Sequence, residues 1–216
     1  KLMTAYLTFA ALRQKTIALD TPVAVSQKAW KTGGSKMFIR VDTQVPVEDL
    51  IKGMIVQSGN DACVALAEAI AGSEESFAQM MNREAKRLGM NASNFTNSTG
   101  LPDPDQYSTA RDLGLLARYI ITTFPEFYAI FSEPEFTWNK IRQMNRNSLV
   151  EMGIGVDGLK TGHTEAAGYG TVVSTAAVTV TPAAAAALVF TTQPAAGTIT
   201  SPITPAMVVT LRDAFG

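Results

Sequence analysis

The chain has 216 residues, and 18 Lys and Arg against 19 Asp and Glu give it a formal net charge of -1. This length allows one sizeable core and part of a second domain, and the near-neutral balance argues against a nucleic-acid partner, which would require a basic excess. No apolar run is long enough to span a membrane, and the single cysteine excludes an internal disulfide.

Residues 1–12 predict a buried helix, because apolar side chains lie around most of its circumference: Leu2, Met3, Tyr6, Leu7, Phe9 and Leu12. Lys1 stands at the head of this helix, where its simplest interpretation is an ordinary chain terminus. Residues 16–45 are mixed in composition and are broken by Gly33 and Gly34. Any further role for Lys1 depends on motifs that lie later in the chain.

A second helix is predicted to begin at Pro46, with acidic residues in its first turn, where negative charge suits the helix dipole. It ends before Ser58, and another helix covers residues 61–71. Ser58 and Asn60 are therefore presented on a turn between two helices. By itself, Ser-Gly-Asn indicates a helix break and cap. Cys63 lies in the apolar run that follows and is interpreted as a buried structural thiol rather than a reactive one.

Two further helices carry clear start signals. Ser73 is the expected N-cap of an amphipathic helix, and Thr109 with Asp112 forms a capping box for a helix that ends at Thr123. The polar segment 91–100 between them predicts an asparagine-rich loop. The aromatic residues that follow are expected in the core rather than as a stacking platform for nucleic acid: Phe127, Tyr128, Phe131, Phe136 and Trp138.

The stretch Val156–Thr164 predicts a short strand that carries Lys-Thr-Gly and ends in a polar turn. Lys160 offers a fixed positive charge, and Thr161 offers a hydroxyl beside it. Gly162 has no side chain, so a substrate backbone can lie against the strand. By itself, Lys-Thr-Gly is common and indicates a strand edge that runs into a turn. The basic segment 139–147 upstream likewise indicates a solvated turn.

Taken together, Lys1, Ser58-Gly59-Asn60 and Lys160-Thr161-Gly162 resemble the trio of serine acyl-transfer enzymes: Ser-x-x-Lys, Ser-x-Asn and Lys-Thr-Gly. On these residues the chain resembles the serine-type D-Ala-D-Ala carboxypeptidases, which are low-molecular-mass penicillin-binding proteins of peptidase family S11. The similarity fades near Gly170. It runs through residues 1–4, 54–63, 106–112, 139–147 and 156–162.

The resemblance implies an α/β (α+β) fold of the β-lactamase/transpeptidase-like type, in which a helical cluster packs on an antiparallel sheet that is incomplete in this chain. Residues 1–170 would form the carboxypeptidase domain fragment. Residues 171–216 are rich in Ala, Thr, Val and Pro and resemble the opening of a bacterial immunoglobulin-like repeat, which needs about a hundred residues. The sequence therefore predicts a fusion of two fragments.

In the family, the sheet uses strands that precede the catalytic serine. The Lys-Thr-Gly strand is therefore expected to leave an unpaired edge, which invites pairing with another strand. Strand-forming stretches of the tail are predicted to pair with it or with its neighbour, within one chain or between two: 171–173, 178–181, 188–192 and 207–211. The alternative is a loose Ala/Thr/Pro linker.

The resemblance also implies a mechanism. A serine attacks the penultimate D-Ala carbonyl of a peptidoglycan stem peptide and forms an acyl-enzyme, which water releases. The family places this serine three residues before the lysine, on the same face of the helix, and that position precedes Lys1. The printed chain is therefore expected to be inactive. Lys1 would accept the serine's proton, Ser58 would relay a proton to the leaving amine, and Asn60 would bind the acyl side chain's amide.

The same resemblance assigns substrate binding to the Lys-Thr-Gly strand. Lys160 and Thr161 would hold the substrate carboxylate, Gly162 would leave room for the substrate backbone, and His163 would lie just beyond. Arg146 would lie near the cleft, where a guanidinium attracts a carboxylate. No cofactor or metal is expected, and His163 is the only histidine of the chain. That count excludes a histidine-rich metal site and leaves a Ser–His–Asp triad without support.

The implied partners are a peptidoglycan pentapeptide or a β-lactam, with no nucleic acid, no membrane span in this chain, and self-association through the sheet edge. The implied location is the periplasm or cell envelope, reached by secretion with a signal peptide that is not in this chain. Two alternatives stay open. One is a non-catalytic remnant that at most binds peptide, and the other is an adhesion-type envelope protein, which the tail indicates.

Overall fold

The computed structural model describes residues 1–175, 187–190 and 207–212. Its helices are α1 (Leu2–Arg13), α2 (Gln27–Lys31), α3 (Val47–Ile55), α4 (Asn60–Ala71), α5 (Glu74–Arg87), α6 (Ala110–Thr123) and α7 (Pro125–Tyr128), with short 3-10 turns η1 (Ala129–Ser132) and η2 (Ser148–Val150). Its strands are β1 (Pro22–Ala24), β2 (Gln44–Pro46), β3 (Glu135–Trp138), β4 (Ile141–Met144), β5 (Val156–Thr164), β6 (Gly168–Thr175), β7 (Ala187–Phe190) and β8 (Met207–Arg212).

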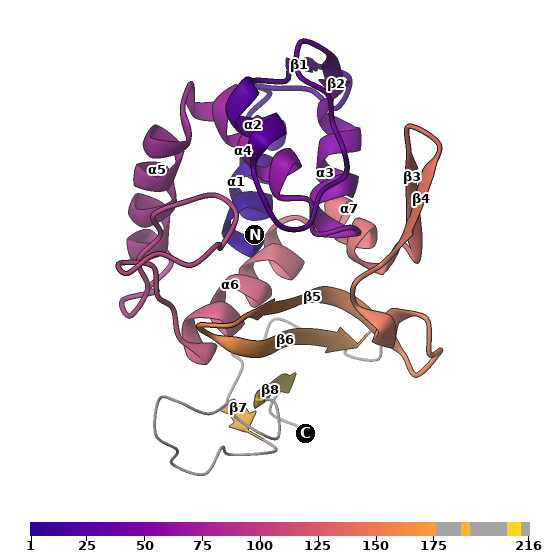
Figure 1. Cartoon of the computed structure of the whole chain (residues 1–216). Helices are drawn as coiled ribbons and strands as arrows, with labels where there is room; N and C mark the ends of the chain where they lie inside the picture. Colours follow the sequence, from indigo (N-terminus) through magenta and orange to yellow (C-terminus); the bar gives the residue numbers. More distant parts are fainter. Residues whose placement is uncertain (176–186, 191–206, 213–216) are drawn as a thin grey trace.

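Helix α1 is the centre of the helical cluster, as its all-round apolar surface predicts. It contacts α3, α4, α5 and α6, and these helices surround it on several sides (Figure 1). Ten of its twelve residues are buried. Even its polar Thr4 and Thr8 are buried, and each hydroxyl donates to a backbone carbonyl, Thr4 to Ser98 and Thr8 to Thr4. Pairing of this kind removes the cost of burying a polar group.

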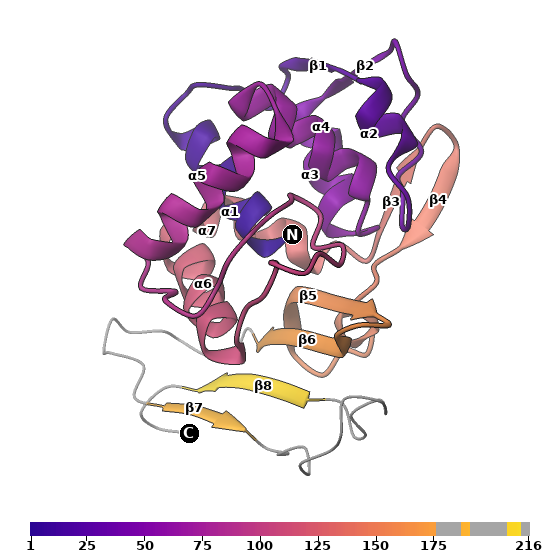
Figure 2. The same ribbon diagram turned by 60° about the vertical axis from the view of Figure 1, so that its left-hand side comes forward.

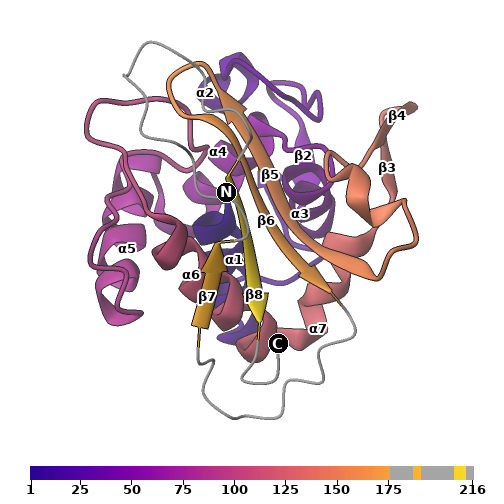
Figure 3. The ribbon, with the colours of Figure 1, turned by 90° about the horizontal axis from the view of Figure 1, so that it is seen from below.

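The main sheet has four strands in the order β5-β6-β8-β7. Strands β5 and β6 form an antiparallel hairpin in which Gly162 lies opposite Gly170 and His163 opposite Tyr169. Strand β8 runs parallel to β6, and β7 runs antiparallel to β8. The helical cluster lies on one side of this sheet, with β5 and β7 as the two edges (Figure 3).

The predicted pairing of the tail is confirmed for β8, which joins β6, the neighbour of the Lys-Thr-Gly strand. The expected sheet was antiparallel, whereas the β6–β8 pair is parallel. A parallel pair needs a long connection between its strands, and the chain between Thr175 and Met207 supplies one that includes β7. The predicted strand at residues 178–181 lies outside the described residues.

Helix boundaries follow the expected caps. The Ser73 side chain accepts from the Ser76 backbone N–H, and the Thr109 side chain accepts from the Asp112 N–H. The second helix begins at Val47, one residue later than predicted, because Pro46 ends β2 and serves as the N-cap. These local hydrogen bonds satisfy donors that a helix start would otherwise leave unpaired.

The predicted aromatic core residues are buried unevenly. Phe131 is fully buried, and Phe127 stacks on Phe9 of α1 with ring centroids 5.0 Å apart. Phe136 and Trp138 are only partly buried, since they lie on the β3–β4 hairpin, which projects from the side of the molecule (Figure 2).

Cys63 is fully buried, as predicted. No helix of the described part of the chain is both long enough and apolar enough to cross a membrane.

Gly158 sits where β5 meets the aromatic cluster, and a side chain there would be crowded. A Cβ atom would lie 3.0 Å from Tyr128 Oη, 3.0 Å from Ser174 Oγ and 3.3 Å from Phe131 Cβ. We expect Gly158→Ala to lower the free energy of unfolding by about 1–3 kcal/mol, because overpacking displaces these neighbours. Chemical denaturation measures this change. Gly170→Ala is the control, since nothing lies within 4 Å of its Cβ position, and equal losses in both variants would contradict the crowding argument.

Candidate active site

The three motifs meet between the helical cluster and β5, where the N-terminus lies in two different views (Figures 1 and 2). Lys1 Nζ donates to Asn60 Oδ1 at 2.6 Å and to the Thr99 backbone oxygen at 2.8 Å. The first contact joins the predicted lysine to the predicted Ser-x-Asn turn across 59 residues of sequence. The second contact brings in the asparagine-rich loop, which sequence reasoning did not place in the site.

Both polar atoms of the Asn60 side-chain amide are hydrogen-bonded. Its Oδ1 accepts from Lys1, and its Nδ2 donates to the Gly33 backbone oxygen at 2.7 Å. Gly34 has φ +76°, and a Cβ there would lie 2.7 Å from Asn60 Nδ2. The Gly33-Gly34 break is therefore part of the wall of the site, because only glycine combines this backbone angle with such a close approach.

Ser58 is presented in an unusual backbone conformation, with φ +60°. This left-handed region is uncommon for residues other than glycine, and such residues gather at functional sites. The residue is partly exposed. The next residue closes the turn, since Gly59 N–H donates to the Gly53 backbone oxygen at 2.9 Å. The turn thus places the hydroxyl-bearing Ser58 between α3 and α4.

Asp61 fixes this turn, and sequence reasoning missed it. Its carboxylate is fully buried and accepts from four backbone N–H groups: Met37 at 3.0 Å, Phe38 at 2.9 Å, Ile39 at 3.2 Å and Ala62 at 3.0 Å. Hydrogen bonds from neutral amides to a buried carboxylate are among the stronger ones in proteins. Asp61 therefore ties the start of α4 to the segment after Gly34. The only feature of the sequence that could have indicated this role is the position of Asp61 directly after Asn60.

The two lysines of the site share a low-dielectric environment. The pKa of Lys160 is lowered to about 7, chiefly by burial and in smaller part by the nearby charges of Lys1 and Arg146. Burial also lowers the pKa of Lys1, while Cys63 and Asp61 oppose that shift. Burial disfavours a charged amine, and a second cation disfavours it again. Burial therefore favours the neutral amine in both lysines, which is the state that a proton acceptor needs.

Arg146 connects the motifs through its backbone. Its N–H donates to the Val56 backbone oxygen at 3.0 Å, and its own carbonyl accepts from Thr161 Oγ1 at 3.2 Å. The segment thereby bridges the end of α3 and the Lys-Thr-Gly strand. The adjacent Asn147 Nδ2 donates to the Gly158 backbone oxygen at 3.2 Å. The Arg146 side chain itself is exposed, and its charge acts on Lys160.

The remaining predicted residues lie along β5. Lys160 Nζ donates to the Thr161 backbone oxygen at 3.0 Å. Gly162 is exposed and has nothing within 4 Å of its Cβ position, so the strand surface is open there. His163 is also exposed, and its ring lies 4.1 Å from the Tyr169 ring across the hairpin. Among the described residues, no cluster of three or more His, Cys, Asp or Glu has the geometry to hold a metal ion.

Comparison with known proteins shows similarity over most of the chain. The sequence model of the Peptidase_S11 family, D-alanyl-D-alanine carboxypeptidase, matches residues 1–190. The chain is 50% identical over 181 residues to the D-alanyl-D-alanine carboxypeptidase DacC of Escherichia coli, which covers 81% of this chain and 45% of that protein. This chain therefore spans less than half the length of that relative.

Solved structures agree with the sequence comparison. Penicillin-binding protein 5 from Haemophilus influenzae superposes with a TM-score of 0.78 at 47% identity, over 81% of this chain and 52% of that one. Penicillin-binding protein D2 from Listeria monocytogenes, in its ampicillin-bound form, superposes with a TM-score of 0.66 at 32% identity, over 81% and 71%. These similarities confirm the predicted mixed fold of helices packed on a sheet.

Proposed function

This chain belongs to the D-alanyl-D-alanine carboxypeptidase family Peptidase_S11, and from that premise we propose that residues 1–170 supply the lysine, Ser-x-Asn and Lys-Thr-Gly parts of a serine acyl-transfer site. The proposed substrate is the D-Ala-D-Ala end of a peptidoglycan stem peptide. A β-lactam would occupy the same site, which is consistent with the ampicillin- and cefotaxime-bound forms of the Listeria monocytogenes protein.

One observation carries this proposal. Lys1 Nζ is hydrogen-bonded to Asn60 Oδ1 at 2.6 Å, while Lys160 lies close enough for the charge of Lys1 to lower its pKa. Three residues from the start, the middle and the end of the domain are therefore electrostatically coupled in one buried place. Groups with strongly shifted pKa values that converge in this way are typical of catalytic sites.

The proposed roles follow from the contacts. Neutral Lys1 takes the proton from the serine Oγ, which attacks the carbonyl carbon of the penultimate D-Ala. Ser58 relays the proton taken up by Lys1 to the leaving amine nitrogen as the peptide bond breaks. Asn60 binds the acyl side chain's amide, and Lys160 with Thr161 and Arg146 attracts the terminal carboxylate. Water then breaks the ester, and the serine regains its proton.

Covalent labelling with a fluorescent penicillin tests the function. The family pattern places the serine three residues before Lys1, so the protein used is residues 1–216 preceded by a family segment that ends in Ser-x-x; we name it the extended chain. We expect one adduct, on the added serine, and none when that serine is replaced by alanine. An extended chain that stays unlabelled, or an adduct on Ser58, would overturn the proposal.

The pH dependence of ligand binding provides a separate prediction. Lys160 has a pKa of about 7, so it is a cation below pH 7 and becomes neutral as the pH rises through 7. A carboxylate ligand favours the cation, so its Kd should be constant well below pH 7 and should rise by up to about tenfold per pH unit above it. Calorimetric titration of D-Ala-D-Ala into the serine-to-alanine extended chain measures this.

Two variants control that experiment. Lys160→Met should bind weakly with little dependence on pH, because the titrating cation is gone. Lys1→Met should move the rise in Kd to higher pH, because the charge of Lys1 is one of the causes that lower the pKa of Lys160. Binding that is independent of pH between 6 and 9 in the parent protein would contradict the role of Lys160.

Location, domain division and self-association also remain proposals. The substrate class supports a place in the periplasm or cell envelope. The change in composition after Gly170 supports a division into residues 1–170 and 171–216, with the latter similar to the start of an immunoglobulin-like repeat. The position of β5 at one edge of the described sheet supports self-association. Light scattering of the protein at several concentrations tests that association, and a strictly monomeric protein would refute it.

A further inference from the structure

The carbonyl that accepts from Lys1 belongs to a loop whose shape is set by its own side chains. Asn97 Oδ1 accepts from Thr99 N–H at 3.2 Å, from Thr99 Oγ1 at 2.9 Å and from Gly100 N–H at 2.8 Å. Gln106 Nε2 and Asn97 Nδ2 both donate to the Leu101 carbonyl, at 2.9 and 3.1 Å. The segment 97–101 is therefore a stiff unit, and its position relative to Lys1 depends on how it is attached.

Ser98 makes that attachment. It is fully buried, and its carbonyl accepts from Thr4 Oγ1 at 2.6 Å, on the same helix as Lys1. Its N–H and its Oγ both donate to Glu74 Oε1, at 3.0 and 2.7 Å. Ser98 directly precedes the residue whose carbonyl holds Lys1, so any displacement of Ser98 moves that acceptor. The loop's other anchors, at Asn82 and Asp112, act on residues 92–95.

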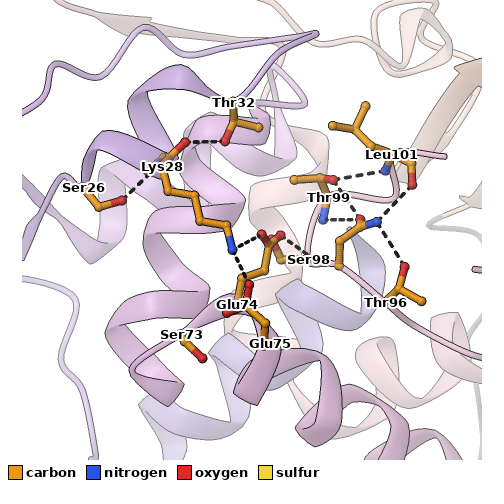
Figure 4. A network of polar contacts seen from close by, with 12 residues as sticks. Ser26, Lys28, Thr32, Ser73, Glu74, Glu75, Thr96, Ser98, Thr99 and Leu101 are labelled. Carbon is orange, nitrogen blue, oxygen red and sulfur yellow. Dashed lines mark hydrogen bonds and ion pairs between the residues drawn. The ribbon is translucent and has the colours of Figure 1, made fainter. Parts of the chain in front are cut away.

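Glu74 is in turn oriented by its partners. It is the first residue of α5, its side chain is only 12% exposed, and its Oε2 lies 3.1 Å from Lys28 Nζ. Lys28 also pairs with the exposed Glu75 at 2.7 Å. Figure 4 shows this chain of contacts, which runs from Lys28 through Glu74 to Ser98, with Thr99 beside it. One Glu74 oxygen therefore faces the loop and the other faces α2.

We propose that Glu74 is a positioning residue: through Ser98 it fixes the Thr99 carbonyl and keeps the 97–101 segment closed over the Lys1 ammonium group. The kinetic consequence rests on the function proposed above, whereas the closure is a property of the fold. The other charged or titratable groups that act on Lys1 are Asp61 and Cys63 on α4, Lys160 on β5 and the α-amino group of Lys1 itself. None of these contacts Glu74 through the hydrogen bonds described.

The pKa of Lys1 should respond to the opening of the 97–101 segment, because burial is the largest cause of its lowered value. Burial lowers the pKa of Lys1, so opening the 97–101 segment to water should raise that pKa toward its ordinary value. Less neutral amine would then be present at pH 7. The acid side of the pH–acylation profile would move to higher pH, while the alkaline side, where Lys160 loses its charge, would stay in place. A loss of stability alone would reduce the amount of active protein and leave the profile in place.

The experiment measures the second-order rate of acylation by a fluorescent penicillin between pH 5 and 10 in the extended chain. We expect Glu74→Ala to move the acid side of the profile to higher pH by about one unit, which slows the rate by up to about tenfold at pH values on that side. Glu74→Gln should stay within about twofold, because its amide oxygen still accepts from Ser98. The acylation rate of Glu75→Ala should also stay within about twofold. This variant removes one negative charge and a contact with Lys28, as Glu74→Ala does, but it removes no contact with Ser98.

Ser98→Ala keeps the N–H contact with Glu74 and loses only the hydroxyl contact, so it should move the pH profile less, in the same direction. If Glu74→Ala does not fold, Ser98→Ala tests the proposal in its place. A slower rate with an unmoved profile, or equal shifts in Glu74→Gln or Glu75→Ala, would overturn the proposal. NMR titration of the Lys1 ε-methylene reports the closure without catalysis. If the parent never acylates, the proposed function fails, and that titration alone confirms or refutes the role of Glu74.

Discussion

Replacing Lys1 by methionine in the extended chain is expected to slow acylation by penicillin about 10²- to 10⁴-fold, the range that general acid–base catalysis contributes. Methionine keeps the length and apolar stem of lysine but cannot accept a proton. The Lys1 amine is hydrogen-bonded to Asn60 and Thr99, and methionine can make neither contact. Stopped-flow or gel-based measurement of the acylation rate constant under saturating penicillin separates this loss from weaker binding.

Lys15→Met is the matched control, because Lys15 is an exposed lysine just after the same helix. It should leave the acylation rate within about twofold, as surface substitutions away from a site usually do. A Lys1→Met protein that acylates within tenfold of the parent would mean that another group takes the serine's proton. In that event the assignment of Lys1 as base would be wrong, although the family membership of the chain would stand.

Asp61→Ala is expected to lower the free energy of unfolding by about 3 kcal/mol or more, the largest stability effect that we foresee. Three of the four N–H groups that Asp61 satisfies belong to the buried residues Met37, Ile39 and Ala62. Each buried donor left without an acceptor costs about 1–3 kcal/mol. The turn that presents Ser58 and Asn60 should also loosen, so ligand binding should weaken. Urea denaturation and penicillin labelling measure the two effects.

Two comparisons sharpen that result. Asp61→Asn keeps one oxygen but turns an amide N–H₂ toward Phe38 and Ile39, whose N–H groups now donate to Oδ2, so an intermediate loss of stability is expected. Glu68→Ala removes a carboxylate from a partly exposed position of the same helix and should change stability by less than about 0.5 kcal/mol. Equal losses for Asp61→Ala and Glu68→Ala would refute the anchoring role of Asp61.

Features that depend on neighbouring residues were readable from the sequence alone. The buried helix at the start of the chain, the caps at Ser73 and Thr109, and the turn at Ser58 all follow from helical periodicity and from hydrogen bonds that span three or four residues. The order of the three motifs also identified the family, because the residue types of a motif and their spacing can be read from the sequence without knowing the fold.

The tertiary structure alone decided which backbone groups complete the site. The carbonyl of Thr99 holds Lys1, that of Gly33 holds Asn60, and that of Arg146 accepts from Thr161. Every residue carries a carbonyl, so residue identity gives no signal for such a role. The parallel pairing of β8 with β6 also depends on the tertiary structure. Strand propensity predicts that a segment is extended, but it does not predict which strand lies beside it. The sequence determined the reactive side chains, and the long-range contacts determined where each of them is held.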